Sequence, residues 1–249
     1  MFFMPFSSFA FRQLSADDPR VRHPFLYHRR NCTRVQAVFR NVTVKNPVKI
    51  LCIVLYFSAE RRNLHVRETC RPVPGRCYQI DRPLLYHSAK LARERGYEIC
   101  TVSYPPLPTG LRGKPERIQQ AIELCSRAAA EQLSGIAPDQ HKQLLFISKS
   151  LGTAVAAICA ARFSLSPQQV YYTPVENSFA YFRREGLVFH GTADPWARTE
   201  VVKNECRRLE LPLFLVENAD HSLETADTLH DLETLHRVMA RTAQYLDER

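Results

Sequence analysis

Apolar runs long enough to cross a lipid bilayer are absent from this sequence of 249 residues. The longest apolar run, Ile50–Phe57, is far shorter than the roughly 20 residues that a membrane-spanning helix needs. The apolar start of the chain, Met1–Phe11, has no basic residue ahead of it and makes a poor secretory signal. The sequence therefore predicts a protein that is neither inserted into a membrane nor secreted.

Cysteine pairs with the spacing of metal or redox motifs are also missing. The chain has 8 cysteines but no Cys-x-x-Cys, and Cys70 and Cys77 are too widely spaced for one. Other cysteines lie inside apolar or helical patterns, namely Cys100, Cys125, Cys159 and Cys206. Buried free thiols in a reducing compartment explain this pattern better than disulfides do, so we expect a cytoplasmic protein.

The glycine pattern of a phosphate-binding loop is missing as well. Such a loop has the form Gly-x-x-x-x-Gly-Lys-Ser/Thr, and Lys149-Ser150 matches only its last two positions. Gln143 and Ser148 stand at the two glycine positions, so there is no glycine-rich cradle for a phosphate. Ser150 therefore needs another explanation.

Basic residues are concentrated in the first part of the chain. Residues 1–100 contain 18 Lys and Arg against 7 Asp and Glu, whereas residues 101–249 contain 16 against 18. A basic region can indicate binding to nucleic acid or to a membrane surface. Here the basic residues are scattered, with no aromatic stacking module or nucleic-acid-binding motif among them. We expect no nucleic-acid or membrane partner.

Apolar runs and helical patterns alternate along most of the chain. The expected strands are Ile50–Phe57, Tyr97–Tyr104, Leu144–Ile147, Gln169–Thr173, Leu187–His190 and Leu213–Val216. The expected helices are Pro83–Gly96, Lys114–Leu133, Ala154–Ala161, Thr199–Leu209 and Leu229–Leu246. This alternation predicts an α/β fold with a mostly parallel central sheet and helices on both faces. The short connection at residues 174–185 leaves no room for a large lid.

The N-terminal third is less regular than the rest. We expect a loose extension at residues 1–30 and one domain over residues 31–249, in which residues 34–45 predict a strand and residues 58–73 are irregular. In one interpretation Ile50–Phe57 is the buried strand that precedes the turn at Pro74-Gly75, and residues 58–73 are an insertion. In the other, part of residues 1–73 is translated in a disturbed reading frame, which resequencing of the coding DNA would test.

Ser150 lies between an expected strand, Leu144–Ile147, and an expected helix, Ala154–Ala161. A sharp strand-turn-helix connection needs small residues two positions before and after its apex. Ser148 and Gly152 occupy these positions. Glycine usually fills both, so Ser148 is a small departure. The pattern resembles the nucleophile elbow of α/β hydrolases and makes Ser150 a candidate nucleophile.

Two further candidates follow expected strands. Asp194 comes after Leu187–His190, and His221 comes after Leu213–Val216. In open α/β sheets, functional groups collect at the carboxyl ends of the strands. The order Ser150, Asp194, His221 is also that of α/β hydrolases. The sequence therefore predicts a Ser-His-Asp triad.

With these motifs, residues 74–249 resemble a small, lidless α/β hydrolase of the dienelactone hydrolase-like group of esterases and thioesterases. The resemblance implies that Ser150 is the nucleophile, that His221 is the base and that Asp194 orients the base. It implies no cofactor and no metal ion.

The resemblance also implies an oxyanion hole made by two backbone N–H groups. One belongs to Leu151, and the other belongs to the turn after Gly75, from Arg76 or, as the second choice, from Cys77. Trp196 and Cys77 are candidates for lining the substrate pocket.

Other polar residues are weaker candidates. Asp220 is an alternative acid, although a residue adjacent to the candidate base normally points away from it. His190 lies at a strand end and is expected to be packed or hydrogen-bonded rather than to act as the base. Lys149 is expected to face out of the turn. His230 and His236 do not share one face of their helix, which argues against a metal site.

The sequence thus predicts a serine hydrolase that cleaves an ester, thioester or related acyl bond of a small substrate through an acyl-enzyme. An acyltransferase or a peptidase would use the same triad. The alternative from another class is a non-catalytic α/β-hydrolase-like protein that binds a ligand or partner, because an irregular N-terminal third can leave the oxyanion loop unformed. The oligomeric state is not predicted.

Overall fold

The computed structural model describes residues 50–57, 81–105, 107–135, 141 and 143–248. All of these residues belong to one unit, Lys45–Arg249. The expected extension at residues 1–30, the expected strand at 34–45 and the irregular segment at 58–73 lie outside the described residues.

A six-stranded sheet runs through this unit in the order β2-β1-β3-β4-β5-β6, and every neighbouring pair of strands is parallel. The strands are β1 (Ile50–Phe57), β2 (Glu98–Tyr104), β3 (Gln143–Lys149), β4 (Gln168–Tyr172), β5 (Leu187–Gly191) and β6 (Leu213–Val216). The expected parallel sheet is confirmed. Parallel sheets are covered on both faces, which explains why several of these strands are nearly continuous apolar runs.

Strand β1 lies inside the sheet, between β2 and β3. Ile53 and Val54 are both fully buried, and they pack into different core clusters. Successive side chains of a strand point to opposite faces, so these two residues place an apolar layer on each side of β1. Ile50–Phe57 is therefore a buried strand of the sheet, as the first interpretation of the N-terminal third requires.

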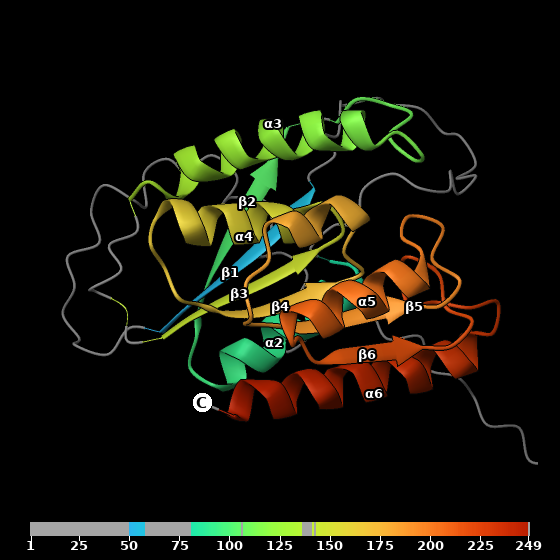
Figure 1. Ribbon diagram of the computed structural model, residues 1–249. Helices are drawn as coiled ribbons and strands as arrows, with labels where there is room; N and C mark the ends of the chain where they lie inside the picture. The colour runs from blue at the N-terminus through green and yellow to red at the C-terminus, as the bar shows by residue number, and fades with distance from the viewer. Residues whose placement is uncertain (1–49, 58–80, 106, 136–140, 142, 249) are drawn as a thin grey trace, which may run out of the picture. The chain divides into compact units, whose positions relative to one another are not determined.

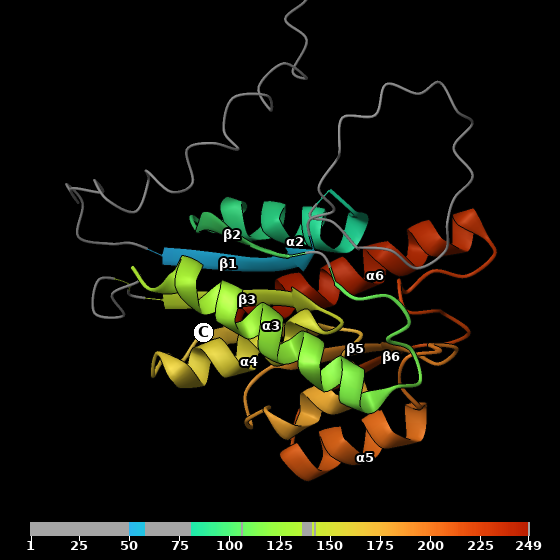
Figure 2. The ribbon, with the colours of Figure 1, turned by 90° about the horizontal axis from the view of Figure 1, so that it is seen from above.

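Helices cover both faces of the sheet (Figure 1). They are α2 (Pro83–Glu94), α3 (Pro115–Leu133), α4 (Gly152–Arg162), α5 (Thr199–Leu209) and α6 (Thr228–Asp247). Helices α2 and α6 lie on one face, and α3, α4 and α5 lie on the other (Figure 2). Three elements, β1, α5 and β6, have the predicted bounds, and the ends of the others lie within two residues of the predicted ends.

Each face of the sheet has its own apolar core. On one face, Ile122 of α3 and Phe146 of β3 belong to the same buried cluster. On the other face, Leu85 of α2, Phe189 of β5 and Val238 of α6 are buried together. Full burial of one such side chain contributes roughly 1.5–3 kcal/mol. This packing fixes the strands whose carboxyl ends carry the candidate residues.

The connection from β4 to β5 contains only a short 3-10 helix, η3 (Glu176–Ala180). Between residues 143 and 248, where the chain is described without a gap, no strand connection contains an inserted lid domain. Among the described helices, none combines the length and the apolar character that a membrane span requires.

Candidate active site

Ser150 lies in the sharp turn between β3 and α4 with a φ of 57°, in the left-handed region where a residue with a side chain is strained. Two backbone hydrogen bonds hold it there. The Ser150 N–H donates to the Tyr172 carbonyl at 2.9 Å, and the Thr153 N–H donates to the Ser150 carbonyl at 3.0 Å. This strained strand-turn-helix geometry is that of a nucleophile elbow.

The residues that flank this turn are tightly enclosed. Ser148 is fully buried, and its hydroxyl donates to the Val170 carbonyl at 3.3 Å. A buried hydroxyl needs such an acceptor, so this bond lets the turn accommodate a serine at this position. After the turn, Ala154 and Val155 are also fully buried. The small side chains let α4 pack closely against the sheet.

Asp194 and His221 lie in the loops that follow β5 and β6, which are adjacent strands. The two loops approach each other at Gly191, where a Cβ atom would collide with the backbone oxygen of Ala219. The Ala193 N–H also donates to the Ala219 carbonyl at 2.9 Å. A glycine at the end of β5 therefore permits the close contact that brings the two side chains together.

The three candidate side chains form a continuous chain of hydrogen bonds. His221 Nε2 lies 2.7 Å from Ser150 Oγ, and His221 Nδ1 lies 2.7 Å from Asp194 Oδ2. A carboxylate can only accept, so Nδ1 carries the proton and Nε2 accepts from the serine hydroxyl. The second carboxylate oxygen, Asp194 Oδ1, accepts from the Trp196 N–H at 2.8 Å. The carboxylate is thus fixed by two donors.

The imidazole of His221 is held in its uncharged form. Burial lowers its pKa, and the nearby ammonium of Lys149 lowers it further, whereas Asp194 acts in the opposite direction. The resulting pKa is about 4, below the ordinary value of 6.5. An imidazole that is uncharged at neutral pH can accept a proton from a hydroxyl.

Backbone donors adjoin Ser150 at the start of α4. Leu151 is the N-cap of this helix, and its N–H makes no hydrogen bond with another described residue. The N-terminus of a helix carries a partial positive charge. This arrangement can stabilise a negative oxygen that forms beside Ser150. Arg76 and Cys77, the other residues predicted for the oxyanion loop, lie outside the described residues.

Trp196 borders the three hydrogen-bonded side chains. Its ring centroid lies 5.5 Å from that of His221, with 31° between the two ring planes. The indole is only partly buried and packs against the apolar cluster that includes Leu151 and Val175. The structure therefore places Trp196 beside the imidazole, and its contact with a substrate stays a prediction.

Asp220, the alternative acid, is engaged elsewhere. Its Oδ1 accepts from the Ser222 N–H at 2.6 Å and from the Glu224 N–H at 3.2 Å. The side chain thus closes a turn in the loop that carries His221. The carboxylate that bonds to the imidazole is that of Asp194.

His190 is a buried, packed residue, as expected from the sequence. Its Nε2 lies 3.0 Å from Thr199 Oγ1, and its Nδ1 lies 3.9 Å from Asp194 Oδ2, beyond hydrogen-bond reach. Burial lowers the pKa of His190. His190 therefore lies beside the Asp194 carboxylate without a hydrogen bond to it.

The prediction for Lys149 is wrong. Only 4% of this residue is exposed, and its ammonium donates to the His221 carbonyl at 2.6 Å. No sequence signal could have revealed this contact, because it joins the end of β3 to a loop that lies far away along the chain.

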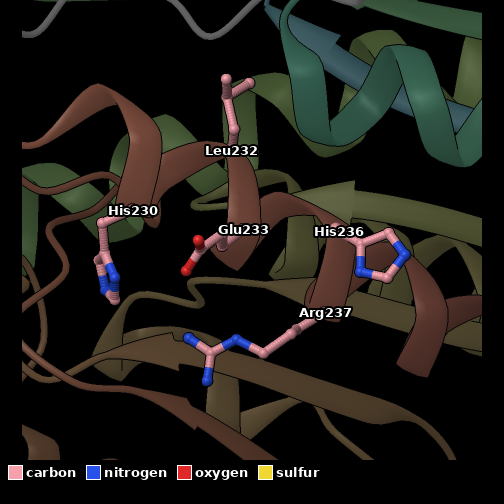
Figure 3. A pocket seen from close by; sticks show the side chains of 5 residues that line it. All are labelled: His230, Leu232, Glu233, His236 and Arg237. Carbon is pink, nitrogen blue, oxygen red and sulfur yellow. The ribbon is translucent and has the colours of Figure 1, made fainter.

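A separate hollow of about 510 Å³ lies beside α6 and is lined by His230, Leu232, Glu233, His236 and Arg237 (Figure 3). The rings of His230 and His236 lie at opposite ends of the labelled group, with Glu233 between them (Figure 3). In the part of the chain that the structure describes, no group of three or more His, Cys, Asp or Glu is placed to hold a metal ion. The hollow shares no residue with the Ser150 site.

Solved structures with the same fold include ATU1826 from Agrobacterium tumefaciens, a protein of unknown function that is a candidate α/β hydrolase. Its TM-score is 0.54 at 15% identity, and the match covers 82% of this chain and 87% of that chain. Est1E from Butyrivibrio proteoclasticus matches with a TM-score of 0.52 at 9% identity, covering 82% of this chain and 91% of that chain.

The esterase Pf2001 from Pyrococcus furiosus matches with a TM-score of 0.51 at 11% identity, covering 80% of this chain and 83% of that chain. No protein-family model matches the sequence, and no curated protein matches it either. At these identities the likeness concerns the fold. The chain has the α/β-hydrolase fold.

Proposed function

We propose that this protein is a serine hydrolase that cleaves an ester, thioester or related acyl bond of a small substrate. The observation that carries the proposal is the unbroken chain of hydrogen bonds from Ser150 through His221 to Asp194. It coincides with a strained backbone at the serine. A serine hydroxyl is a poor nucleophile until a base takes its proton, and this arrangement supplies the base.

In the proposed reaction, Ser150 Oγ attacks the carbonyl carbon of the substrate while its proton passes to His221 Nε2. Asp194 keeps the proton on Nδ1 and stabilises the imidazolium that forms. The tetrahedral intermediate then collapses, and the imidazolium gives its proton to the leaving group. Water repeats the sequence on the acyl-enzyme, releases the acid and restores Ser150. The residues take part as acid, base and nucleophile. The serine proton departs with the leaving group, and a proton from water restores the Ser150 hydroxyl.

The proposed oxyanion hole includes the Leu151 N–H at the start of α4. Loss of one such donor costs about 3–4 kcal/mol of transition-state stabilisation. Arg76 stays the proposed source of the second donor, and Cys77 and Trp196 stay proposed contacts of the substrate. Trp196 has the better support, because its ring lies beside that of His221.

The roles of the acid and the serine are tested by steady-state turnover of p-nitrophenyl acetate and by the mass of the quenched protein. We expect an acetyl group on the peptide that contains Ser150. Asp194→Asn should lower kcat by about 10⁴-fold, because an amide favours the wrong tautomer of His221. Asp220→Asn is the matched control and should retain most of the activity.

Turnover that survives Asp194→Asn and disappears in Asp220→Asn would contradict this assignment. Acyltransferases form the same acyl-enzyme, so the reaction is repeated with added alcohols and amines as competing acceptors. A hydrolase releases acetate in their presence, whereas an acyltransferase yields the acetylated acceptor as the main product.

A further inference from the structure

The ammonium of Lys149 lies in the interior, directly before the candidate nucleophile. Burial of a charged group is unfavourable unless the group is hydrogen-bonded and surrounded by compensating charge. Lys149 Nζ satisfies the first condition by donating to the His221 carbonyl oxygen at 2.6 Å. A lysine in this position is therefore bound to the backbone of the residue whose ring contacts Ser150.

A second donor acts on the same carbonyl oxygen. Thr173 follows β4, is fully buried, and donates from Oγ1 to the His221 carbonyl at 2.9 Å. The Thr173 N–H in turn donates to the Phe189 carbonyl of β5 at 2.8 Å. The backbone of His221 is thus tied to the ends of β3 and β4, while its ring is tied to Ser150 and Asp194.

Three acidic groups act electrostatically on the ammonium. Asp194, Asp220 and Glu224 all raise the pKa of Lys149, although burial is the larger effect and brings this pKa to about 8. Among the charged groups that act on His221, Asp194 and Asp220 favour the imidazolium and Lys149 opposes it. Lys149 is the cation of this set, so its removal would leave the imidazole facing carboxylates alone.

We propose that Lys149 is a positioning residue for His221, which fixes the histidine loop through the shared carbonyl oxygen and opposes a second positive charge on the ring. The inference rests on the proposed serine-hydrolase function, because it assigns a partner to the base of that reaction. It adds a requirement for a buried cation at the position before Ser150.

The experiment compares wild type with Lys149→Met, Lys149→Gln and Thr173→Val. Lys149→Met removes both the donor and the charge, whereas Lys149→Gln keeps a donor without the charge. Thr173→Val removes the other donor and keeps the charge, so it serves as the matched control. Melting curves establish which variants fold. The readouts are kcat and KM for p-nitrophenyl acetate from pH 4 to 9, and the titration of the His221 ring by NMR.

Lys149→Met should lower kcat by about 10- to 100-fold, because a misplaced catalytic group costs this much, and should leave KM nearly unchanged. The acid limb of the profile of kcat/KM should move to higher pH by about one unit in both lysine variants. In Thr173→Val the limb should keep its wild-type position. An unchanged kcat and an unchanged acid limb in a folded lysine variant would overturn the proposal, and if Lys149→Met fails to fold, Lys149→Gln decides.

NMR separates failure of this inference from failure of the proposed function. The His221 signal is assigned by its loss in His221→Gln. If wild type shows no turnover, the proposed hydrolase activity fails, and the ring titration alone tests the role of Lys149. A titration that moves to higher pH in the lysine variants and stays in place in Thr173→Val supports the inference. Equal titrations in all four proteins contradict it.

Discussion

Ser150 combines a strained backbone with a fixed environment. A positive φ costs a residue with a side chain of the order of 1–3 kcal/mol, and the surrounding structure must offset this. Its neighbours do so through the backbone bonds that Ser150 donates to Tyr172 and accepts from Thr153, and through the bond of the Ser148 hydroxyl to Val170. The small residues around Ser150 are local in sequence, so this turn could be predicted from sequence alone.

Residues that come together only in the folded chain differ in how well the sequence predicts them. Asp194 and His221 could be predicted because each follows a strand and their order matches the α/β-hydrolase triad. Lys149 could not, because nothing near it in sequence indicates that it reaches the His221 carbonyl. A lysine beside a turn is usually solvated, and only the three-dimensional contact overrides this expectation.

The lowered pKa of His221 gives a prediction for the dependence on pH. The proposed base acts only when uncharged, so kcat/KM for p-nitrophenyl acetate should stay level from pH 8 to pH 6. It should fall as the pH approaches the His221 value of about 4. The unfolded chain binds this proton near pH 6.5, so the same histidine makes stability decrease between about pH 6.5 and 4. An acid limb centred above pH 6.5 would contradict the prediction.

At the scale of elements, the contact between the ends of β5 and β6 decides whether Asp194 meets His221. Gly191→Ala should separate the two loops, because its Cβ would collide with the backbone oxygen of Ala219. We expect a loss of kcat of at least about 100-fold, since small displacements of catalytic groups cost this much. Turnover and the melting temperature are measured together.

Gly113→Ala is the matched control for this variant. Gly113 has a φ of 73° and open space around its Cβ position, so alanine there should cost about 1 kcal/mol of stability through backbone strain. Its kcat should stay at the wild-type value. Equal kcat values for the two alanine variants would show that the β5–β6 contact does not control the site.

A buried hydroxyl network joins three elements away from the site. The Tyr172 hydroxyl of β4 lies 2.8 Å from Ser88 Oγ of α2 and 2.8 Å from Thr242 Oγ1 of α6. Both partners also donate to their own helices, so each keeps a hydrogen bond if the phenol is removed. Tyr172→Phe should therefore lower the free energy of unfolding by only about 1 kcal/mol. Urea denaturation measures this change.

Tyr86→Phe is the control, because Tyr86 of α2 is 46% exposed. The change in the free energy of unfolding caused by Tyr86→Phe should stay within about 0.5 kcal/mol. A loss of more than about 3 kcal/mol in Tyr172→Phe would mean that the two helices depend on the phenol for their attachment to the sheet.

At the scale of the whole molecule, the alternation of apolar runs and helical patterns was enough to predict the layers and most element bounds. The strand order could not be predicted, because the alternation of strands and helices along the chain does not indicate that β1 lies between β2 and β3. The sequence also did not indicate how many helices lie on each face of the sheet. These features depend on crossover connections and on packing between distant segments, which leave no local pattern.

The packing of the whole domain predicts which thiols resist modification. Cys125, Cys159 and Cys206 are buried, and burial raises their pKa values to about 12, 11 and 12. Thiols react as thiolates, so these three should remain unlabelled by iodoacetamide at pH 8 and should become labelled in urea. Peptide mass spectrometry identifies each site. Rapid labelling of all three in the native protein would contradict the described core.

The most direct test of the proposed serine nucleophile is labelling with a fluorophosphonate, which reacts only with an activated serine. Wild type is compared with Ser150→Ala after circular dichroism shows that both are folded. We predict that wild type is labelled on the peptide containing Ser150 and that Ser150→Ala is not labelled. A folded wild type that takes up no probe, or a Ser150→Ala variant that is labelled equally well, would contradict the proposed function.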